Sequence, residues 1–398
     1  MKSARWDSQG KKVEGKKQDM GVLIDSPRKV LVLKSSSLGD IIHALPAVSA
    51  LRQLWPNARI TWLVKQSWAP ILKGNPDLNE VWPVDFSVRC WPALLRKLRQ
   101  GAYDVVVDFQ GLFRSGLLSW LSGAPARVGF DRAREGATIF YTDRLGLPEL
   151  TGVAWRLGDM HAVDRNLALV RHVGADPTRG TWHFPHEPED QEMVEGFLES
   201  AGVKERDGLV GIAPWSRAAL KCWPLDRFVE VSRRLITEKG IRPVLIGGPQ
   251  DISLANSFRH LVPAGLLDCV GKVSLGQLPV LLRHMQVLVG NDSASLHIAA
   301  GLGLPVVGLY GPTHSKATGP YPVDRHVVLQ ASLPCTPCGQ QTCSWPIYQE
   351  CMQTIEVQDV FDKLCGMLSA PFGKKSGEWS TRHPSGSEPV AQASMKRQ

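Results

Sequence analysis

The sequence predicts an α/β protein made of two doubly wound, Rossmann-like domains that face a cleft. Strand and helix patterns alternate along the chain, which is typical of parallel βαβ units. The strand patterns are near-continuous runs of Val, Ile and Leu, as expected for strands buried on both faces. The alternation stops near residues 175–207 and then starts again, so the second half repeats the architecture of the first.

The first half begins with a strand at residues 29–34, followed by a short polar turn and a helix that runs to about Trp55. Its other expected elements are strands at 59–64, 80–84 and 103–109 and a helix at 91–100. Prolines at positions 177, 185 and 188, within a run of mixed charge, indicate a connection between domains.

In the second half, strands are expected at 209–213, 242–246, 286–289 and 306–310. Helices are expected at 225–239, 252–260, 275–285 and 293–302, with an amphipathic closing segment at 357–368. The predicted organisation is a tail (1–27), an acceptor domain (28–175), a linker (176–206), a nucleotide-sugar domain (207–355), a closing helix (356–370) and a second tail (371–398).

The net charge of +8 lies mostly on the two tails. Residues 1–20 hold six Lys and Arg against three acids, and residues 371–398 hold five against two, which leaves about +2 for the body. Because a nucleic-acid binder carries its excess charge on the folded domain, nucleic acid is an unfavourable partner. Both tails have the low-complexity composition of disordered segments, and their charge favours an anionic membrane surface.

Neither a membrane span nor a secretory signal is expected. The apolar runs are shorter than the roughly 18 residues that a spanning helix needs, and the N-terminus is polar and rich in lysine. We therefore expect a cytoplasmic protein.

The first candidate site is the turn Ser35–Asp40, directly after the first strand. This context places Asp40 at the carboxyl edge of the sheet, where its carboxylate can accept the proton of an incoming hydroxyl. Alternatively, Asp40 only caps the helix that follows. The turn lacks the G-x-G-x-x-G pattern of a dinucleotide fingerprint.

The second candidate site is Asn291–His297, again between a strand and a helix. Ser293, Ala294 and Ser295 stand at a helix N-terminus, where backbone N–H groups bind phosphate. Asp292 can serve there as a helix cap, and His297 as a packing residue inside the helix.

Two more loops follow strands of the second half. In the loop 213–224, Lys221 can neutralise a leaving diphosphate, or it is a solvated surface lysine. In Ile246–Asp251, the glycines permit close backbone approach, and Gln250 or Asp251 can bind a ribose hydroxyl; the segment can also be only a turn.

Four of the eight cysteines lie within 17 residues, with the spacing C-x2-C-x4-C-x7-C. Cys335, Cys338, Cys343 and Cys351 can make a structural zinc site, although the spacing is not a standard pair of C-x2-C motifs. Free thiols beneath the C-terminal segment are the favoured interpretation.

Together and in this order, these segments resemble glycosyltransferase family 9, the ADP-heptose:lipopolysaccharide heptosyltransferases. The resemblance covers about residues 29–361. It is carried by KSSSLGDIIHALPAV (34–48), YDVVVDFQGLFRSGLL (103–118), VGFDRARE (128–135), HAVDRNLALV (161–170), the KCWP and GGPQD segments, VGNDSASLHIAAGLGLPVVGLYGPT (289–313) and the cysteine run. FQGLFRSG and GFDRAREGA are more similar to heptosyltransferase I, which adds the first heptose to Kdo2-lipid A, than to heptosyltransferase II.

The resemblance implies a GT-B fold and an inverting reaction that needs no bound metal or cofactor, with an ADP-sugar as donor substrate. Asp40 would be the general base, Lys221 would contact the donor phosphates and Asp251 the ribose. The expected donor-binding set is Ser216, Lys221, Asp251, Asp292, Ser293, Ala294, Ser295 and His297. Arg114, Arg132 and Arg134 would face the acceptor and pair with Kdo carboxylates, or else pair with Asp131 and Glu135.

The implied partners are ADP-heptose, a Kdo2-lipid A type acceptor and the cytoplasmic face of the inner membrane. Relatives often have Thr-Gly where this chain has Ser293-Ala294, and the loop from Pro214 to Lys221 is slightly longer than in some of them. Alternatives are a nucleotide-sugar epimerase, a transferase with a different donor sugar, and a binding adaptor without activity.

Overall fold

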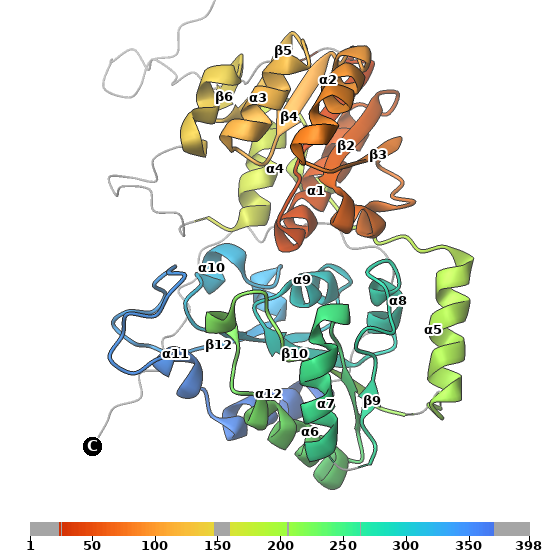
Figure 1. Ribbon diagram of the computed structural model, residues 1–398, viewed down its shortest axis with the longest axis vertical. Coiled ribbons are helices and arrows are strands. Elements are labelled where there is room, and N and C mark those ends of the chain that lie inside the picture. Colours follow the sequence, from red (N-terminus) through yellow and green to blue (C-terminus); the bar gives the residue numbers. More distant parts are fainter. Residues whose placement is uncertain (1–23, 25, 147–159, 205–206, 263, 370–398) are drawn as a thin grey trace, which may run out of the picture.

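The computed structural model describes residues 24, 26–146, 160–204, 207–262 and 264–369. These residues form two lobes stacked along the long axis of the molecule (Figure 1). Most of both tails lies outside the described residues. None of the helices within these ranges is long and apolar enough to cross a bilayer.

The first lobe contains a parallel six-stranded sheet in the order β3-β2-β1-β4-β5-β6. Its strands are β1 (Lys29–Leu33), β2 (Arg59–Lys65), β3 (Glu80–Val84), β4 (Val105–Asp108), β5 (Ala126–Phe130) and β6 (Asp143–Leu145). Its helices are α1 (Leu38–Leu54), α2 (Trp91–Gln100), α3 (Phe113–Leu121) and α4 (Ala162–His172), with 3-10 turns that include η1 (Gln66–Leu72) and η3 (Arg134–Phe140).

The second lobe contains another parallel six-stranded sheet, in the order β12-β11-β10-β7-β8-β9. Its strands are β7 (Leu209–Ala213), β8 (Arg242–Leu245), β9 (Leu267–Asp268), β10 (Val287–Asn291), β11 (Val306–Tyr310) and β12 (Val327–Gln330). Its helices are α6 (Leu225–Lys239), α7 (Ile252–Leu261), α8 (Leu278–Arg283), α9 (Ala294–Gly301), α10 (Ser315–Thr318), α11 (Glu350–Gln353) and α12 (Val357–Ser369), with turns η5 (Ala219–Lys221) and η6 (Pro249–Asp251).

Both sheets have the same topology. If strands β7 to β12 are counted as the first to the sixth strand of their own lobe, the order of the second sheet, read backwards, is the order of the first. The two-domain α/β prediction is therefore confirmed at the level of sheet order. In each sheet the strand order reverses beside the first strand, between β1 and β4 and between β7 and β10. Ligands of doubly wound sheets bind at the carboxyl ends of the strands at this position.

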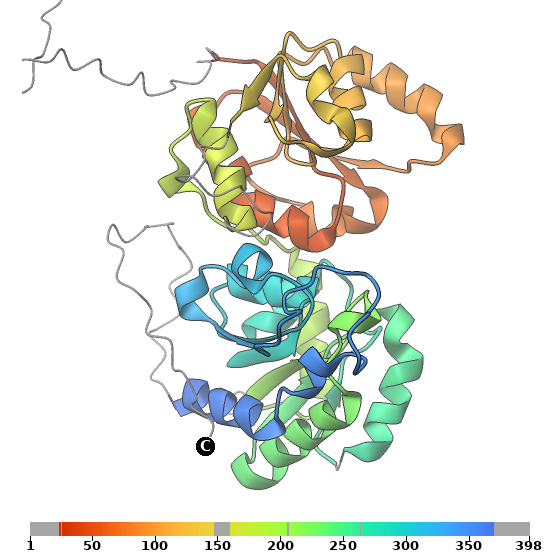
Figure 2. The same cartoon turned by 90° about the vertical axis from the view of Figure 1, so that its left-hand side faces the viewer.

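Helix α1 is buried almost all round, which is unusual for the helix of a surface layer. It packs against α4 in its own lobe and against α9 in the other, so it lies between the two lobes. Figure 2 shows this contact from the side, with the first lobe above and the second below. The polar turn before α1 is therefore held where the lobes meet.

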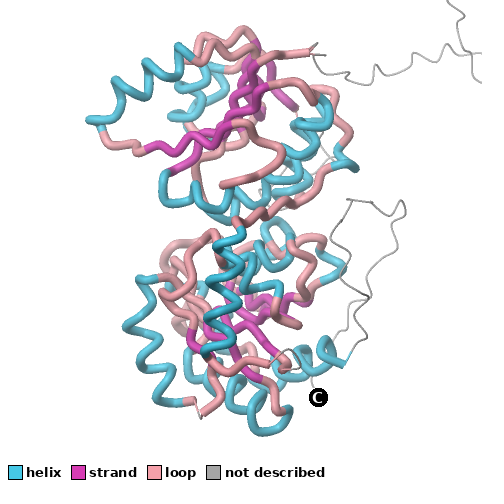
Figure 3. Tube along the Cα trace, turned by 90° about the vertical axis from the view of Figure 1, so that its right-hand side faces the viewer, coloured by secondary structure: helices cyan, strands magenta, loops and turns pink. Residues whose placement is uncertain are grey.

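The region expected to be a linker contains a helix that the sequence reading missed. Helix α5 (Pro188–Ser200) buries Val194 and Leu198 and packs against α8 on the flank of the second lobe (Figure 3). Pro188 stands at its first turn, followed by two acids. A proline and acids in the first turn favour a helix start, so the expected connection between the domains contains a helix. The closing helix is α12, which buries Val360, Phe361 and Leu364 in the core of the second lobe.

Candidate active site

Loops from the carboxyl edges of both sheets meet between the lobes. A Cβ atom added at Gly39, next to Asp40, would lie 2.9 Å from His297 Cδ2 in α9. His43 Nε2 lies 3.3 Å from His297 Nδ1, and the guanidinium of Arg217 lies 5.3 Å from the ring centre of Trp68 in the first lobe. The N-terminus of α1 therefore faces the N-terminus of α9, which brings the first two candidate sites together.

Asp40 is both a helix cap and a partly open carboxylate. Its Oδ2 accepts hydrogen bonds from Ser37 N at 3.1 Å and from Ser37 Oγ at 2.6 Å, while Oδ1 lies 3.8 Å from Lys34 Nζ. The side chain keeps 38% of its surface exposed. Burial acts to raise the pKa of Asp40, but Lys34 and the Ser37 hydrogen bonds outweigh it, so the pKa lies below its ordinary value. The group is a carboxylate at neutral pH.

Two cations beside Asp40 were not identified from the sequence. Lys34 directly follows β1 and is 4% exposed, and its Nζ donates to the carbonyl of Phe109. Arg165 in α4 is also close to Asp40, and its buried Nε has no hydrogen-bond partner among the described residues. Burial lowers the pKa of Lys34 and the pKa of Arg165. Repulsion by Arg165 lowers the pKa of Lys34 further. The signal for Lys34 was a charge at the end of an apolar strand; Arg165 stood in the HAVDRN segment.

Asp292 organises the second-lobe side of the site. Its Oδ2 accepts a 2.7 Å bond from Lys221 Nζ, and its Oδ1 lies 3.7 Å from His297 Nε2. Its backbone carbonyl accepts from Ser216 Oγ at 2.8 Å. Burial acts to raise the pKa of Asp292, yet the contacts with His297 and Lys221 hold it well below its ordinary value. The structure thus brings four of the expected donor residues together.

The loops around this network carry buried polar atoms that find no hydrogen-bond partner in the part of the chain that the structure describes. They are Ser293 Oγ at the start of α9, Trp215 Nε1 in the loop after β7 and Thr313 Oγ1 after β11. Buried polar groups are nearly always paired in native proteins, so each exception calls for an explanation. These three follow neighbouring strands of one sheet, and a polar ligand bound at its carboxyl edge would satisfy them. Ala294 has no side-chain hydroxyl and can offer such a ligand only its backbone N–H.

Asp251 lies one strand further along the same edge, at the end of η6. Its Oδ2 accepts from Gly248 N at 2.8 Å and from Gln250 Nε2 at 3.0 Å, which closes the turn Gly247–Asp251. A Cβ atom on Gly247 would lie 2.7 Å from the ring of Trp215. The glycine is therefore needed for close packing of this turn on the loop after β7.

The three arginines expected at the acceptor are placed differently. Arg114 stacks over the ring of Phe86 at 4.2 Å and lines a small cavity with Lys34 and Ser35. Arg134 is exposed in η3. Its positive charge helps to lower the pKa of Lys34 and the pKa of Arg165. Arg132 is exposed in the same loop. Glu135 accepts from the backbone N–H of Phe113.

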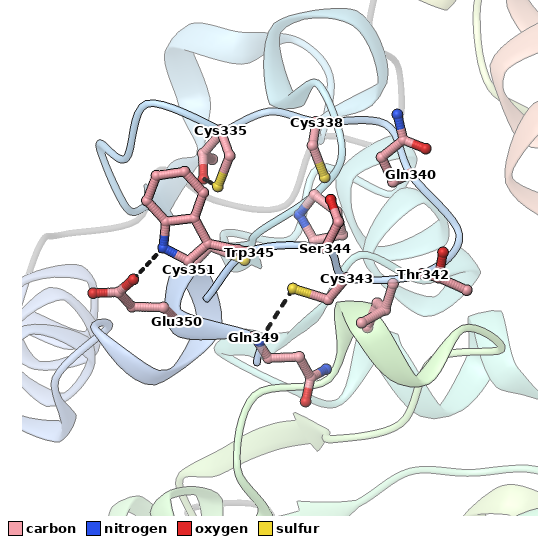
Figure 4. A pocket seen from close by; sticks show the side chains of 13 residues that line it. Cys335, Cys338, Gln340, Thr342, Cys343, Ser344, Trp345, Gln349, Glu350 and Cys351 are labelled. Atoms are coloured by element: carbon pink, nitrogen blue, oxygen red, sulfur yellow. Dashed lines mark hydrogen bonds between the residues drawn. The ribbon is translucent and has the colours of Figure 1, made fainter. Parts of the chain in front are cut away.

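The four clustered cysteines line one cavity of about 40 Å³ near Leu220 and Pro312 (Figure 4). Burial, and then the three neighbouring cysteines, raise the pKa of Cys351, so this thiol stays protonated at neutral pH. Within the described ranges, no group of three or more His, Cys, Asp or Glu side chains is placed to hold a metal ion.

Comparison with known proteins points to one family. Residues 91–349 match glycosyltransferase family 9 (heptosyltransferase). The chain is 29% identical to lipopolysaccharide heptosyltransferase 1 of Pseudomonas aeruginosa over 376 residues, covering 86% of this chain and 99% of that protein. Other relatives are named lipopolysaccharide heptosyltransferase 2 and 3.

Solved structures agree on the fold. A family 9 glycosyltransferase from Veillonella parvula superposes with a TM-score of 0.74 at 23% identity, covering 87% of this chain and 99% of that one. The E. coli heptosyltransferase WaaC with ADP superposes with a TM-score of 0.66 at 23% identity, covering 85% and 99%. These likenesses confirm the GT-B arrangement of two Rossmann-like domains.

Proposed function

Because the chain belongs to glycosyltransferase family 9, the heptosyltransferase family, we propose that it transfers heptose from ADP-heptose to the inner core of lipopolysaccharide. The observation that carries this proposal is the apposition of Asp40 in one lobe and the Asp292–Lys221–His297 network in the other. A base and a diphosphate site on opposite sides of one interface suit transfer between two bound substrates.

The donor would occupy the carboxyl edge of the second sheet. Its diphosphate would meet the backbone N–H groups at the start of α9 and the hydroxyl of Ser293, since helix N-termini favour anions. Lys221 has three N–H donors and gives one to Asp292, which leaves two for phosphate oxygens. Asp251 would accept from ribose hydroxyls beside the Gly247–Gly248 turn.

Asp40 would take the proton of the acceptor hydroxyl as that oxygen attacks the anomeric carbon. The bond between this carbon and the diphosphate oxygen breaks, and ADP leaves with the bonding electron pair. Lys221 would stabilise the charge that develops on the leaving group, which lowers the barrier because that charge grows in the transition state. Attack from the face opposite the leaving group inverts the anomeric centre, with no metal in the step.

We further propose a Kdo-type sugar acid of Kdo2-lipid A as the acceptor, which corresponds to heptosyltransferase I. The support is a group of three cations: Lys34, Arg165 and Arg134 are close enough to repel one another beside the carboxyl groups of Asp40 and Asp108. Guanidinium groups match carboxylates geometrically. Such an acceptor would be met at the cytoplasmic face of the inner membrane.

The test is ADP release from ADP-heptose by the purified full chain, with and without Kdo2-lipid A. We expect release to depend on the acceptor and a heptose to be added to the product by mass spectrometry. Release with an inner-core acceptor that already carries one heptose, but not with Kdo2-lipid A, would replace the subtype I assignment. No heptose transfer to either acceptor would overturn the proposed function.

A further inference from the structure

The first lobe carries an apolar surface that the catalytic site does not use. Along α3, Phe113, Leu117 and Trp120 follow one another at helical spacing on the outer side. Ile139 and Phe140 of η3 lie beside them, and the Phe140 ring is 5.3 Å from Phe113 and 6.5 Å from Trp120 between ring centres. We call these five residues the α3 patch.

The large side chains of the α3 patch are open to solvent. Phe113 is 45% exposed, Trp120 54% and Ile139 75%. Exposed large apolar side chains that touch one another mark an interaction surface, whereas single ones do not. Figure 1 shows α3 beside β5 and β6 on the outer part of the first lobe, away from the second.

Exposed arginines, with the acids Asp131 and Glu135 among them, lie on the segments that carry the patch and on the neighbouring strand β6. Arg114 follows Phe113 on α3, and exposed Arg134 and Arg144 lie in η3 and β6. The main-chain carbonyl of Phe140 is fixed by Arg127 Nε at 2.7 Å, so η3 is held against this side of the lobe. Aromatic rings with arginines at their edges suit the boundary between headgroups and acyl chains, and the arginines attract anionic lipids.

The helix that carries the patch also lines a cavity beside the catalytic edge. Arg114, one residue from Phe113, lines a cavity together with Lys34, and Lys34 lies 3.8 Å from Asp40. A bilayer that covers the patch would therefore end beside the proposed base. An acceptor anchored by its acyl chains could then present its sugar to Asp40 without leaving the membrane.

From these observations we infer that the α3 patch is a docking surface for an anionic bilayer. Phe113, Trp120 and Ile139 insert at the headgroup boundary and the neighbouring arginines bind lipid phosphates. This inference rests on the proposed function, because a lipid acceptor would explain why the first lobe carries a surface that binds a bilayer. Binding itself requires no sugar transfer, which lets the two be tested separately.

The test is flotation of the full chain with vesicles of phosphatidylethanolamine, phosphatidylglycerol and cardiolipin, and with vesicles of phosphatidylcholine alone. The variant is Phe113→Ser/Trp120→Ser/Ile139→Ser. The matched control is Leu254→Ser/Leu261→Ser, which removes two exposed apolar side chains from α7 of the other lobe. Flotation at high salt weakens the contribution of the basic tails and of the exposed arginines alike, so the binding that remains reports the insertion of apolar side chains.

We expect the native chain and the α7 control to float with anionic vesicles, and the α3 variant to lose binding by about 10-fold or more, since insertion scales with buried apolar area. ADP release with a deacylated, water-soluble acceptor should change by less than about 2-fold in the α3 variant, which shows an intact site. Equal flotation of the α3 variant and the native chain would overturn the inference. Sedimentation could also contradict the inference. If the native chain formed a dimer and only the α3 variant were monomeric, the patch would be a subunit interface. If no acceptor supports ADP release, the proposed function is wrong. The flotation result still tests whether the α3 patch binds a bilayer.

Discussion

At the scale of single residues, Asp40 shows that the two interpretations of its sequence position are compatible. One carboxylate oxygen closes the cap of α1 with Ser37, and the other lies toward Lys34 on the open side. The cap fixes the rotamer of the side chain, and the nearby cation keeps it ionised. A residue can therefore be held by a structural role in the geometry that a catalytic role needs.

Replacing Asp40 by Asn separates these roles. The amide oxygen can still accept from Ser37, so α1 should remain capped, but an amide cannot take a proton. We expect kcat to fall by about 10²–10⁴-fold, with ADP affinity by calorimetry nearly unchanged. Ser37→Ala is the matched control, since it removes a hydrogen bond to Oδ2 and leaves the carboxylate. An Asp40→Asn enzyme that turns over within a few-fold of the native rate would show that Asp40 is only a cap.

Lys221 and Asp292 form a partly buried pair whose lysine is proposed to face the leaving group. Lys221→Ala should lower kcat by about 10²-fold or more, as for loss of a donor to developing charge, and weaken ADP binding. Lys272→Ala is the control, because Lys272 also pairs with an aspartate of the same lobe, Asp268, and its own side chain is 48% exposed. Kinetics and calorimetry with ADP at a temperature where all variants are folded measure both effects. Unchanged ADP affinity and kcat would identify a structural ion pair.

At the scale of elements, the buried strands with long apolar runs were predictable, whereas helices α3, α4 and α5, the interior strand β5 and the short edge strands were not among the expected elements. Strands β1, β2 and β7 have uninterrupted apolar runs, and the sequence alone placed their bounds within about one or two residues. Strands β6 and β9 have three and two residues at sheet edges, too few for a periodic pattern. Their pairing depends on neighbours that are distant in the sequence.

The residues of the candidate site also fall into two groups, those that the sequence made candidates and those that it did not. Asp40, Lys221 and Asp292 stand in polar segments after predicted strands, which made them candidates, and the resemblance to the family gave them their expected roles. Arg165 and His43 lie inside helices, and only the contacts of α1 with α4 and α9 bring them to the site. Position after a strand was therefore neither sufficient nor necessary, because Lys34 follows β1 and was missed, whereas His297 lies inside α9 and was among the expected donor residues.

Helix α4 joins the lobes through a histidine that must be neutral. His161 caps α4 by accepting from Val163 N through Nδ1, and its Nε2 donates to the carbonyl of Gly319 in the second lobe. Both bonds are made only when Nδ1 carries no proton. Burial lowers the pKa of His161 from 6.5 to about 4, with smaller contributions from His297 and Arg165, while the Gly319 bond acts in the opposite direction. His43, whose pKa burial also lowers, and Tyr321 pack against its ring.

The free energy of unfolding should therefore fall as the pH drops. The folded pKa lies below the unfolded one, so the unfolded chain takes up the proton first, and stability present above about pH 6.5 is lost progressively down to about pH 4. His161 would account for a loss of about 3 kcal/mol at 1.36 kcal/mol per pKa unit. Urea unfolding between these pH values measures the slope, and His161→Asn, which keeps a capping oxygen, should flatten it. An identical slope in the variant would assign the pH dependence to other groups.

At the scale of the whole molecule, the two lobes are joined by a few specific contacts across their interface. Tyr321 Oη donates to Asp164 at 2.7 Å, His161 to Gly319 at 3.1 Å, and Arg217 lies over Trp68. The groups proposed to bind phosphate belong to the second lobe, and the cations proposed to bind the acceptor belong to the first. Under the proposed function, each substrate would therefore have its own sheet, and the reaction would take place at the interface.

This division of labour predicts that acceptor and donor kinetics respond to different lobes. Replacing Arg114, Arg132 or Arg134 by Ala should raise the acceptor KM by about 10-fold or more, taking a lost charged hydrogen bond at about 1.5–3 kcal/mol. Arg134 should show the largest effect of the three, because it lies close enough to Lys34 and Arg165 to add to their repulsion. ADP-heptose affinity without acceptor should not change.

The control for these arginines is Arg96→Ala, which removes an exposed guanidinium from α2 of the same lobe. It should leave both KM values unchanged, since a surface charge away from the site contributes little. Lys221→Ala should give the reverse pattern, with weaker donor binding and an unaltered acceptor KM. If an arginine variant of the first lobe instead lost donor affinity and kept its acceptor KM, the diphosphate would have to reach across the interface. The assignment of one substrate to each sheet would then be wrong.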